Sequence, residues 1–242
     1  IKYDSDMNIL ASSSITQLAF FGTQTYKDTY SRDIITIVLR MGGNVWIFDG
    51  AEGLQLQLQR ATLKIKNISR IFVTNLSINR IGGIPNLIQM MSPSVSKTQQ
   101  FSKVEIYGPP GLRSYLKMYF HFTKSFFTNP YVVHELHSKS IENANQLVNK
   151  IEINSKYSKY GEQIGGKNIF PDKCKDIWTL YETDKVSIRA SLIRTDIPSF
   201  AYIVEEKEEN GSLKEPEKII DVLDRNKNAI IALGYRLVLL VL

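Results

Sequence analysis

The amino-acid sequence predicts an α/β protein in which a sheet is covered by helices. The first indication is residues 71–85, where an apolar β-branched run is followed by a polar loop, by Gly82-Gly83 and by an apolar segment with helical spacing. The second is residues 104–112, which contain an apolar strand, a Gly-Pro turn and the start of a helix. A strand that leads through a polar loop into a helix is the repeating unit of α/β folds, and such loops usually hold their functional residues.

Length and composition limit the classes of protein that fit. A chain of 242 residues with 43% hydrophobic residues can bury a sizeable core within one large domain. It contains no run of about eighteen apolar residues, so we expect no transmembrane helix and no membrane partner. The single cysteine, Cys174, excludes an internal disulfide and indicates a reducing compartment. The net charge of +6 and the pI near 9.2 permit an acidic partner such as RNA.

The N-terminal part of the chain predicts an extension and three strands. Residues 1–14 lack clear periodicity and are interpreted as an N-terminal extension, so that the domain occupies residues 15–242. Strands are expected from Ile15 into a glycine turn, and at 35–39 and 44–48 as a hairpin around Gly42-Gly43. Residues 54–60 then alternate between apolar and polar positions, which taken alone is the period of a strand.

The middle of the chain predicts a helix and another strand. Residues 112–127 carry aromatic side chains mostly on one face, which indicates a helix packed against the core. Asn129-Pro130 ends this helix, and residues 131–136 form the next strand. His134 and His137 could be mistaken for a pair of metal ligands. Because they are three positions apart at a strand they point to different faces, and we expect structural histidines.

Residues 71–85 resemble the signature of the ribonuclease Z branch of the metallo-β-lactamase superfamily, the tRNA 3′-processing endonucleases. In that family the loop reads Thr-His-x-His-x-Asp-His, followed by x-x-Gly-Leu-Pro. This chain keeps the frame of the signature at Thr74, Gly83, Ile84 and Pro85. The family's His, His, Asp and His are replaced by Asn75, Ser77, Asn79 and Arg80.

Further matches extend the resemblance to about residues 15–214. They lie at residues 20–23, at residues 48–55 (the family's Phe-Asp-Cys-Gly-Glu-Gly-Thr-Gln), at residues 107–111 and at residues 200–202. Counting back from the last match places Thr195 at another family histidine. The family's later Gly-Asp-Thr and final histidine do not occur before Leu242. The resemblance therefore implies a metallo-β-lactamase fold of the αββα type, present here only in part, with a helix rather than a strand at residues 54–60.

The replaced side chains predict a site without metal and without catalysis. Zinc is bound by imidazole, thiolate or carboxylate, and a hydrolytic site needs at least about three such ligands. Asn and Ser are poor ligands for zinc, and the guanidinium of Arg80 cannot lose its proton. We therefore expect no catalytic residue and no cofactor, with Asn75, Ser77 and Asn79 in a hydrogen-bonded turn. A hydrolase with other ligands has no cluster of His, Cys and carboxylate to use.

Two interpretations of Asp49 remain open from the sequence. In the family this turn lies beside the metals, and its Asp supports the histidine loop. In this chain Asp49 either pairs with Arg80 in a charge-assisted contact or caps the helix that begins near Glu52.

The chain also has an asymmetric charge distribution. Between Leu54 and Ser102 there is no Asp or Glu. The candidate RNA-binding residues lie in this stretch: Arg60, Lys64, Lys66, Arg70 and Arg80. The alternative is an ordinary solvated basic face. Residues 138–175 are polar and have no counterpart of this length in compact family members, so we interpret them as an insertion that forms a mobile loop or a partner-binding surface.

Together these features predict a catalytically inactive ribonuclease Z-like protein. We expect a structural or RNA-binding subunit of a larger ribonucleoprotein assembly, with tRNA or rRNA and protein subunits as partners. A mitochondrial ribosome is the expected setting, and another intracellular location the alternative. The competing hypothesis is an inactive partner subunit of an active tRNA 3′-processing endonuclease, since the family forms homodimers and its long forms fuse an inactive half to an active one.

Overall fold

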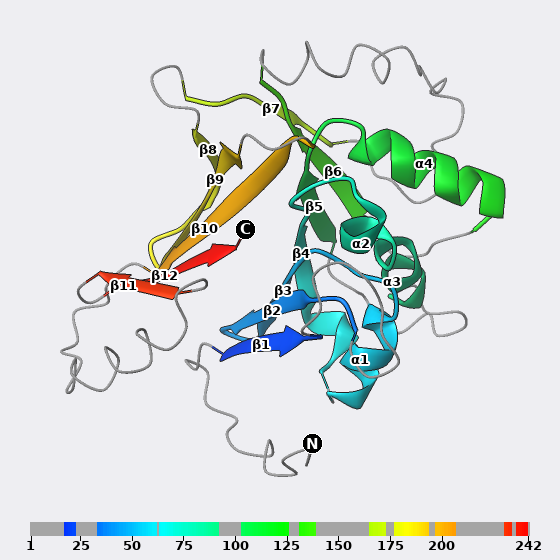
Figure 1. Cartoon of the computed structure of the whole chain (residues 1–242), viewed down its shortest axis with the longest axis horizontal. Helices are drawn as coiled ribbons and strands as arrows, with labels where there is room; N and C mark the ends of the chain where they lie inside the picture. Colours follow the sequence, from blue (N-terminus) through cyan, green and yellow to red (C-terminus); the bar gives the residue numbers. More distant parts are fainter. Residues whose placement is uncertain are drawn as a thin grey trace.

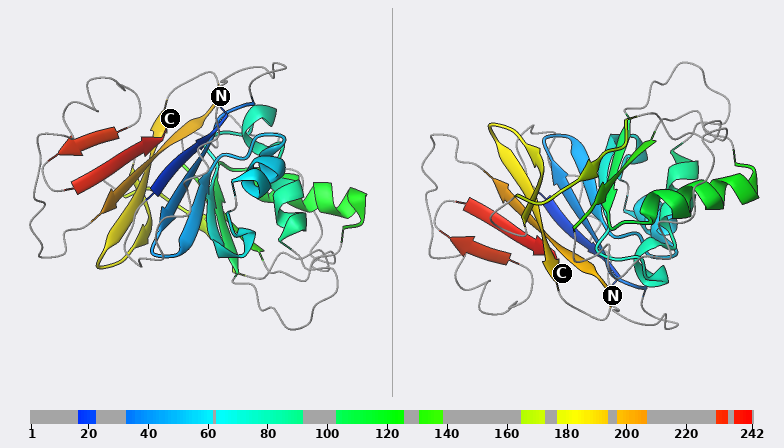
Figure 2. Two further views of the ribbon diagram at one scale, coloured as in Figure 1. Left: turned by 90° about the horizontal axis from the view of Figure 1, so that it is seen from below. Right: turned by 90° about the horizontal axis from the view of Figure 1, so that it is seen from above.

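The computed structural model describes residues 17–22, 33–61, 63–91, 103–125, 131–138, 165–172, 177–193 and 197–206, together with the backbone of 230–233 and 236–241. Within these residues, two sheets and one layer of helices form three layers. Figure 1 shows the helices on one face of the first sheet and the second sheet against its other face. The two views of Figure 2 show the same order of layers.

The first sheet contains strands β1 to β7 in chain order. Its N-terminal strands are β1 (Gln17–Phe21), β2 (Thr36–Met41) and β3 (Asn44–Phe48), and both pairings among them are antiparallel. Gly42 and Gly43, with φ of 54° and 85°, form the turn between β2 and β3. Two consecutive residues with positive φ are characteristic of the tightest hairpin turns, so the predicted hairpin is confirmed.

The remaining strands of the first sheet are parallel. They are β4 (Ile68–Phe72), β5 (Val104–Gly108), β6 (Tyr131–Leu136) and β7 (Asn168–Ile169), and β3 also pairs in parallel with β4. Because β3 to β6 run the same way, all four end at one edge of the sheet, the C-terminal edge, and begin at the opposite N-terminal edge. β7 belongs to the predicted insertion, so part of that segment extends the sheet. β4 begins three residues before the apolar run that predicted it.

The helices follow the parallel strands. They are α1 (Leu54–Arg60), the short 3₁₀ helix η1 (Ile65–Asn67), α2 (Ile78–Ile81), α3 (Ile84–Met90) and α4 (Leu112–Thr123). Residues 54–60 are helical, as the family resemblance implied, and they bury Leu54, Gln57 and Leu58 at helical spacing. Among the described residues, no helix has the length and apolar composition needed to cross a membrane.

The predicted helix at 112–127 is shorter than expected. α4 ends at Thr123 because Lys124 adopts a left-handed conformation, with φ of 51°, and donates its N–H to the carbonyl of His121. The aromatic pair Phe126-Phe127, which suggested a longer helix, lies outside the described residues.

The second sheet has the strand order β11-β12-β10-β9-β8 and is antiparallel throughout. Its strands are β8 (Ile177–Glu182), β9 (Val186–Ile193), β10 (Ser199–Glu206), β11 (Ile230–Leu233) and β12 (Arg236–Val241). The family match at residues 200–202 falls in β10, whereas no pattern in the sequence indicated β8.

Each face of the first sheet is buried in its own core. One core joins the sheet to the helices and includes Ile47, Ile71, Ile106, Leu87 and Leu116. The other lies between the sheets, where the rings of Phe48, Phe72, Tyr107 and His134 stack in sequence across four neighbouring strands, with centroids 4.9, 5.3 and 4.8 Å apart. A sheet buried on both faces is typical of α/β proteins, and the fold class predicted from the sequence is confirmed.

Candidate functional site

The candidate site lies at the C-terminal edge of the first sheet, where three segments meet. Asp49 follows β3, residues 73–83 connect β4 to α3, and Ser199 opens β10 of the second sheet. Their backbones are joined directly, because Phe200 donates its N–H to the carbonyl of Thr74 at 2.8 Å. The edge at which parallel strands end is where α/β proteins usually bind their ligands.

Asp49 is the buried centre of this region. Only 1% of the residue is exposed, and its φ of 62° is one that few residues other than glycine adopt. Its carboxylate accepts hydrogen bonds from the N–H of Thr74 at 2.7 Å and from the hydroxyl of Thr74 at 3.0 Å. Its own N–H donates to the carbonyl of Phe72 at 2.7 Å. Asp49 therefore fixes the end of β4 from the neighbouring strand.

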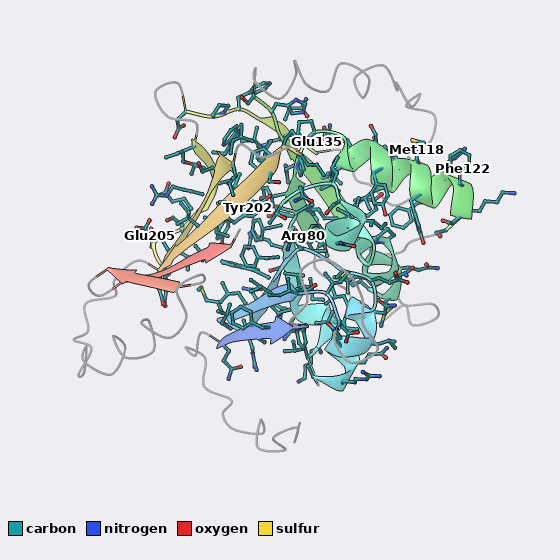
Figure 3. The ribbon with its side chains drawn as sticks, in the orientation of Figure 1. Arg80, Met118, Phe122, Glu135, Tyr202 and Glu205 are labelled. Carbon is teal, nitrogen blue, oxygen red and sulfur yellow. The ribbon has the colours of Figure 1, made fainter. Side chains whose placement is uncertain are left out.

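Arg80 forms an ion pair with Asp49. The Nη1 of Arg80 lies 2.9 Å from Oδ2 of Asp49, and 21% of the arginine side chain is exposed against 2% of the aspartate side chain. α1 begins after Gly53 without a side-chain cap, so the interpretation of Asp49 as the helix cap is wrong and the pairing with Arg80 is confirmed. Figure 3 labels Arg80 at the junction of the helical layer and the first sheet.

Backbone contacts hold the two halves of the motif together. Gly50 donates its N–H to the carbonyl of Arg80 at 2.6 Å, and Gly83 donates to the carbonyl of Gly50 at 2.8 Å. A Cβ at Gly83 would collide with the backbone carbonyl of Ala51. Glycine is therefore required at this position by the close approach of two backbones, whatever chemistry the site performs.

Electrostatics at the site are set by burial. Burial raises the pKa of Asp49, whereas the charge of Arg80 and the hydrogen bonds from Thr74 oppose this effect. Tyr202 is fully buried, and burial together with the negative charge of Asp49 raises the pKa of its hydroxyl well above the usual value. This hydroxyl donates to the carbonyl of Val73 at 2.6 Å, so a neutral Tyr202 ties β10 to the end of β4.

Asn75 and Ser77 form the predicted hydrogen-bonded turn, whereas Asn79, which was expected in the same turn, lies in the helix α2. Asn75 accepts the N–H of Ser77 at 3.0 Å through Oδ1 and donates from Nδ2 to the hydroxyl of Ser199 at 3.2 Å. Ser77 precedes α2, and Asn79 is partly buried within it. An Asn side chain that accepts the N–H two residues later is a common way to close a loop before a helix. Thr195 lies outside the described residues.

These side chains do not fit a zinc ion. Both carboxylate oxygens of Asp49 and the amide oxygen of Asn75 accept hydrogen bonds from the protein, and Arg80 brings a fixed positive charge to the same place. Zinc requires nitrogen, sulfur or carboxylate donors that are free to coordinate. Over the part of the chain that the structure describes, no three His, Cys, Asp or Glu side chains form a group that could hold a metal ion.

The five candidate RNA-binding residues do not share one surface. Arg80 lies at the C-terminal edge, whereas the exposed side chains of Arg60, Lys64 and Lys66 precede β4 at the N-terminal edge. Arg70 faces the second sheet, where its Nε lies 3.2 Å from Glu105 and its guanidinium lies 3.7 Å from the ring centre of Tyr181. Arg70 is thus engaged in contacts within the protein.

Glu135 is a buried carboxylate that no motif in the sequence marked. It lies near the end of β6 and accepts the N–H groups of Gly111 and Arg113, each at 2.9 Å, at the start of α4. Its other oxygen lies 3.4 Å from Nε2 of His137. Burial alone would raise the pKa of Glu135, but the hydrogen bond with His137 and the contacts with Arg113 and Gly111 lower it overall. The sequence contained one signal for this site, which was a carboxylate near the end of a predicted strand. The helix start that it contacts follows the Gly-Pro-Pro-Gly turn.

The two histidines have different surroundings. His134 stacks on Tyr107, accepts the N–H of Lys167 at 3.3 Å, and has its pKa lowered chiefly by burial. His137 contacts Glu135, and its ring centre lies 5.9 Å from that of Phe170. Each ring therefore has a packing or hydrogen-bonding partner in the fold.

Comparison with known proteins gives one consistent group of relatives. The chain is 30% identical over 200 residues to the zinc phosphodiesterase ELAC protein 1 of Mus musculus, a match that covers 81% of this chain and 54% of that protein. It is 26% identical over 197 residues to ribonuclease Z of a Nostoc species, covering 81% of this chain and 48% of that protein. The chain thus spans about half the length of the curated relatives it matches. No protein-family model matches it.

The structural comparison agrees with the sequence comparison. The crystal structure of the short form of human tRNase Z superposes with a TM-score of 0.64 and 28% sequence identity. This match covers 80% of this chain and 64% of the human chain.

Proposed function

This chain is a ribonuclease Z-like protein with the metallo-β-lactamase fold, and we propose that it is a non-catalytic one that serves as a structural or RNA-binding subunit of a ribonucleoprotein assembly. The setting proposed for this assembly is a mitochondrial ribosome. The relatives are named as zinc phosphodiesterases and ribonucleases. In this proposal the chain differs from them in lacking catalytic activity, and RNA is its partner.

The observation that carries the proposal is the ion pair between Asp49 and Arg80. A buried carboxylate needs a nearby cation or hydrogen-bond donors, since an isolated buried charge is very costly. Here the guanidinium of Arg80, at 2.9 Å, and the N–H and hydroxyl of Thr74 fill this role. These side chains can therefore hold the loop in place without a metal ion. This explains how the chain can keep the frame residues of the motif although the residues at the metal-ligand positions are replaced.

The frame also has a structural reason to persist. Gly50 and Gly83 join the turn after β3 to the start of α3, and Tyr202 joins the same region to the second sheet. These contacts stabilise the junction of the layers. A fold that depends on this junction retains the residues that build it even when no reaction is performed there.

Cleavage of precursor tRNA under single-turnover conditions tests the proposal. We expect no release of the 3′ trailer with protein in excess over RNA and with zinc or manganese added, while filter binding under the same conditions retains the RNA. An active ribonuclease Z is the positive control. Cleavage by this chain that disappears in Asp49→Ala would contradict the proposal, because it would assign a catalytic role to this site.

The alternative of an inactive partner subunit is distinguished by purification from the native source. Under the main proposal the chain copurifies with RNA and assembly proteins. Copurification in equal amounts with a chain that contains Thr-His-x-His-x-Asp-His would favour the alternative instead.

A further inference from the structure

A row of exposed basic side chains lies at the N-terminal edge of the first sheet, opposite the candidate site. The row, here called the basic rim, comprises Arg40, Arg60, Lys64, Lys66, Lys103 and Lys124. Lys64 and Lys66 precede β4, Lys103 precedes β5 and Lys124 precedes β6. Because these strands are parallel and adjacent, their first residues share one edge, so residues far apart in the sequence are brought together.

The helices bring two more members to the same edge. α4 runs antiparallel to β6, since Gly111 at its start contacts Glu135 near the end of β6, and Phe120 near its end contacts Tyr131 at the start of β6, with ring centres 5.8 Å apart. Lys124 therefore lies at the N-terminal edge. Arg60 ends α1, the helix that leads from β3 back towards the start of β4. On the other side, Arg40 lies next to the β2–β3 turn.

Among the described residues, the helical side of the rim lacks unbalanced negative charge. Between Leu54 and His134 the sequence contains ten Lys or Arg residues and a single acidic residue, Glu105. Glu105 lies 3.2 Å from Arg70, so its charge is balanced within the fold. The exposed carboxylates described at this end are Glu182, the last residue of β8, and Asp184 in the β8–β9 connection; both belong to the second sheet and mark the boundary of the rim.

An exposed aromatic ring accompanies the basic side chains. Phe122, two residues before Lys124 on the last turn of α4, is 75% exposed, and Met118 one turn earlier is 37% exposed. Figure 3 shows both residues on the outer part of α4, away from the sheets. Bases of single-stranded nucleic acids stack on exposed aromatic side chains, whereas neighbouring lysines contact the phosphates.

We propose that the basic rim, together with Phe122, is a binding surface for single-stranded RNA. This inference rests on the proposed RNA-binding function and assigns it to the edge opposite the Asp49–Arg80 loop. In the part of the chain that the structure describes, the row of cations has no interspersed carboxylates, which suits the regular negative charge of a phosphate backbone, and the ring of Phe122 favours nucleic acid over an acidic protein.

Two single variants with equal loss of charge test the surface. Lys66→Gln removes one rim charge, and Lys167→Gln removes one exposed charge outside the rim, just before the strand β7 that pairs with the end of β6. The probe is a labelled oligouridylate of about 12 nucleotides, titrated at several salt concentrations. For single-stranded RNA, the log–log slope of affinity against salt falls by about 0.7 for each phosphate contact that is lost, so the rim variant should lower the slope by about 0.7. The control variant should match the wild type.

A third variant separates RNA from an acidic protein partner. Phe122→Ala removes an exposed ring and should leave the melting temperature unchanged, while it weakens oligouridylate binding about fivefold or more. Polyglutamate should bind more weakly than RNA and should not respond to this change. If polyglutamate binds equally well and Phe122→Ala has no effect, the surface is a site for acidic protein and the proposal is wrong.

The outcomes also distinguish this inference from the proposed function. If the wild type binds oligouridylate but both single variants bind with the wild-type slope, the rim is not the surface, and the RNA-binding function stands. If the wild type fails to bind RNA at low salt, the RNA-binding role fails together with the inference, and only the structural role of the proposed function is left.

Discussion

At the scale of single residues, Asp49 organises the candidate site because both of its carboxylate oxygens are engaged. Thr74 and Arg80 contact it from the loop after β4, although they are 25 and 31 positions away in the sequence. The sequence left two roles open for Asp49, an ion pair with Arg80 or the cap of the helix that begins near Glu52. It could not choose between them, since the choice depends on where α1 starts and on how closely the loop folds over β3.

Replacing Arg80 by Ala should destabilise the fold without weakening RNA binding. The change leaves the buried carboxylate of Asp49 without its ion-pair partner. Loss of a fully buried partner costs about 3–5 kcal/mol, and because Arg80 is partly exposed we expect about 1–3 kcal/mol. Thermal and urea unfolding measure this loss, and filter binding measures RNA affinity.

Arg60→Ala is the matched control for Arg80→Ala. Arg60 is exposed at the N-terminal edge, so its removal should leave the melting temperature unchanged and reduce RNA affinity slightly. The opposite pattern, in which Arg80→Ala weakens RNA binding at an unchanged melting temperature, would show that Arg80 contacts the ligand instead of Asp49.

Other contacts of single residues could not be predicted from the sequence. Tyr202 donates to Val73 across 129 positions, and Glu135 accepts from Gly111 across 24. Neither pair has a local pattern, because each contact exists only once the layers are assembled. The Phe-Ala-Tyr match marked Tyr202 as part of the family frame without indicating its hydrogen bond.

At the scale of secondary-structure elements, those with strong local sequence patterns were predicted, whereas those that depend on tertiary contacts were not. The β2–β3 hairpin followed from alternation around Gly42-Gly43, and β6 was predicted with its observed bounds. The alternating residues 54–60 are helical because their position after β3 places Leu54 and Leu58 in the core beneath the helices. β8 was missed because its polar and aromatic residues lack a clear period, and it is stabilised by pairing with β9.

The junction of α4 with β6 gives a prediction for pH. The pKa of Glu135 in the folded chain is lowered, so the unfolded chain takes up the proton at higher pH. The stabilising contribution of Glu135 is therefore fully present above the usual glutamate value of 4.5 and is lost as the pH falls below it. Urea unfolding of the wild type at a series of pH values should show this decrease.

Glu135→Gln provides the comparison for this decrease. The amide keeps an oxygen for the N–H groups of Gly111 and Arg113 but removes the charge, so stability at neutral pH should fall by about 1–3 kcal/mol. The loss of stability between neutral and acid pH should then be smaller than in the wild type. A variant curve parallel to that of the wild type would mean that another group is responsible. Glu52→Gln, at an exposed position, should change neither quantity.

At the scale of the whole molecule, the fold places the loop of the motif and the basic side chains on opposite edges of one sheet. The C-terminal edge holds the Asp49–Arg80 loop, which joins the layers, and the N-terminal edge holds the basic rim. The sequence identified the basic stretch as a unit. It could not show that the stretch divides between two edges and that Arg70 is directed into the space between the sheets, because that division follows from the parallel strand order.

The zinc content of the purified chain tests the central claim most directly, because the claim is that protein side chains fill the place of the metal. The chain should be purified without chelator, equilibrated with zinc, freed of excess ion and subjected to elemental analysis. We expect far less than one zinc per chain and an unchanged melting temperature after treatment with a chelator. About one zinc or more per chain, lost when Asn75 and Asn79 are replaced by Ala, would contradict the account.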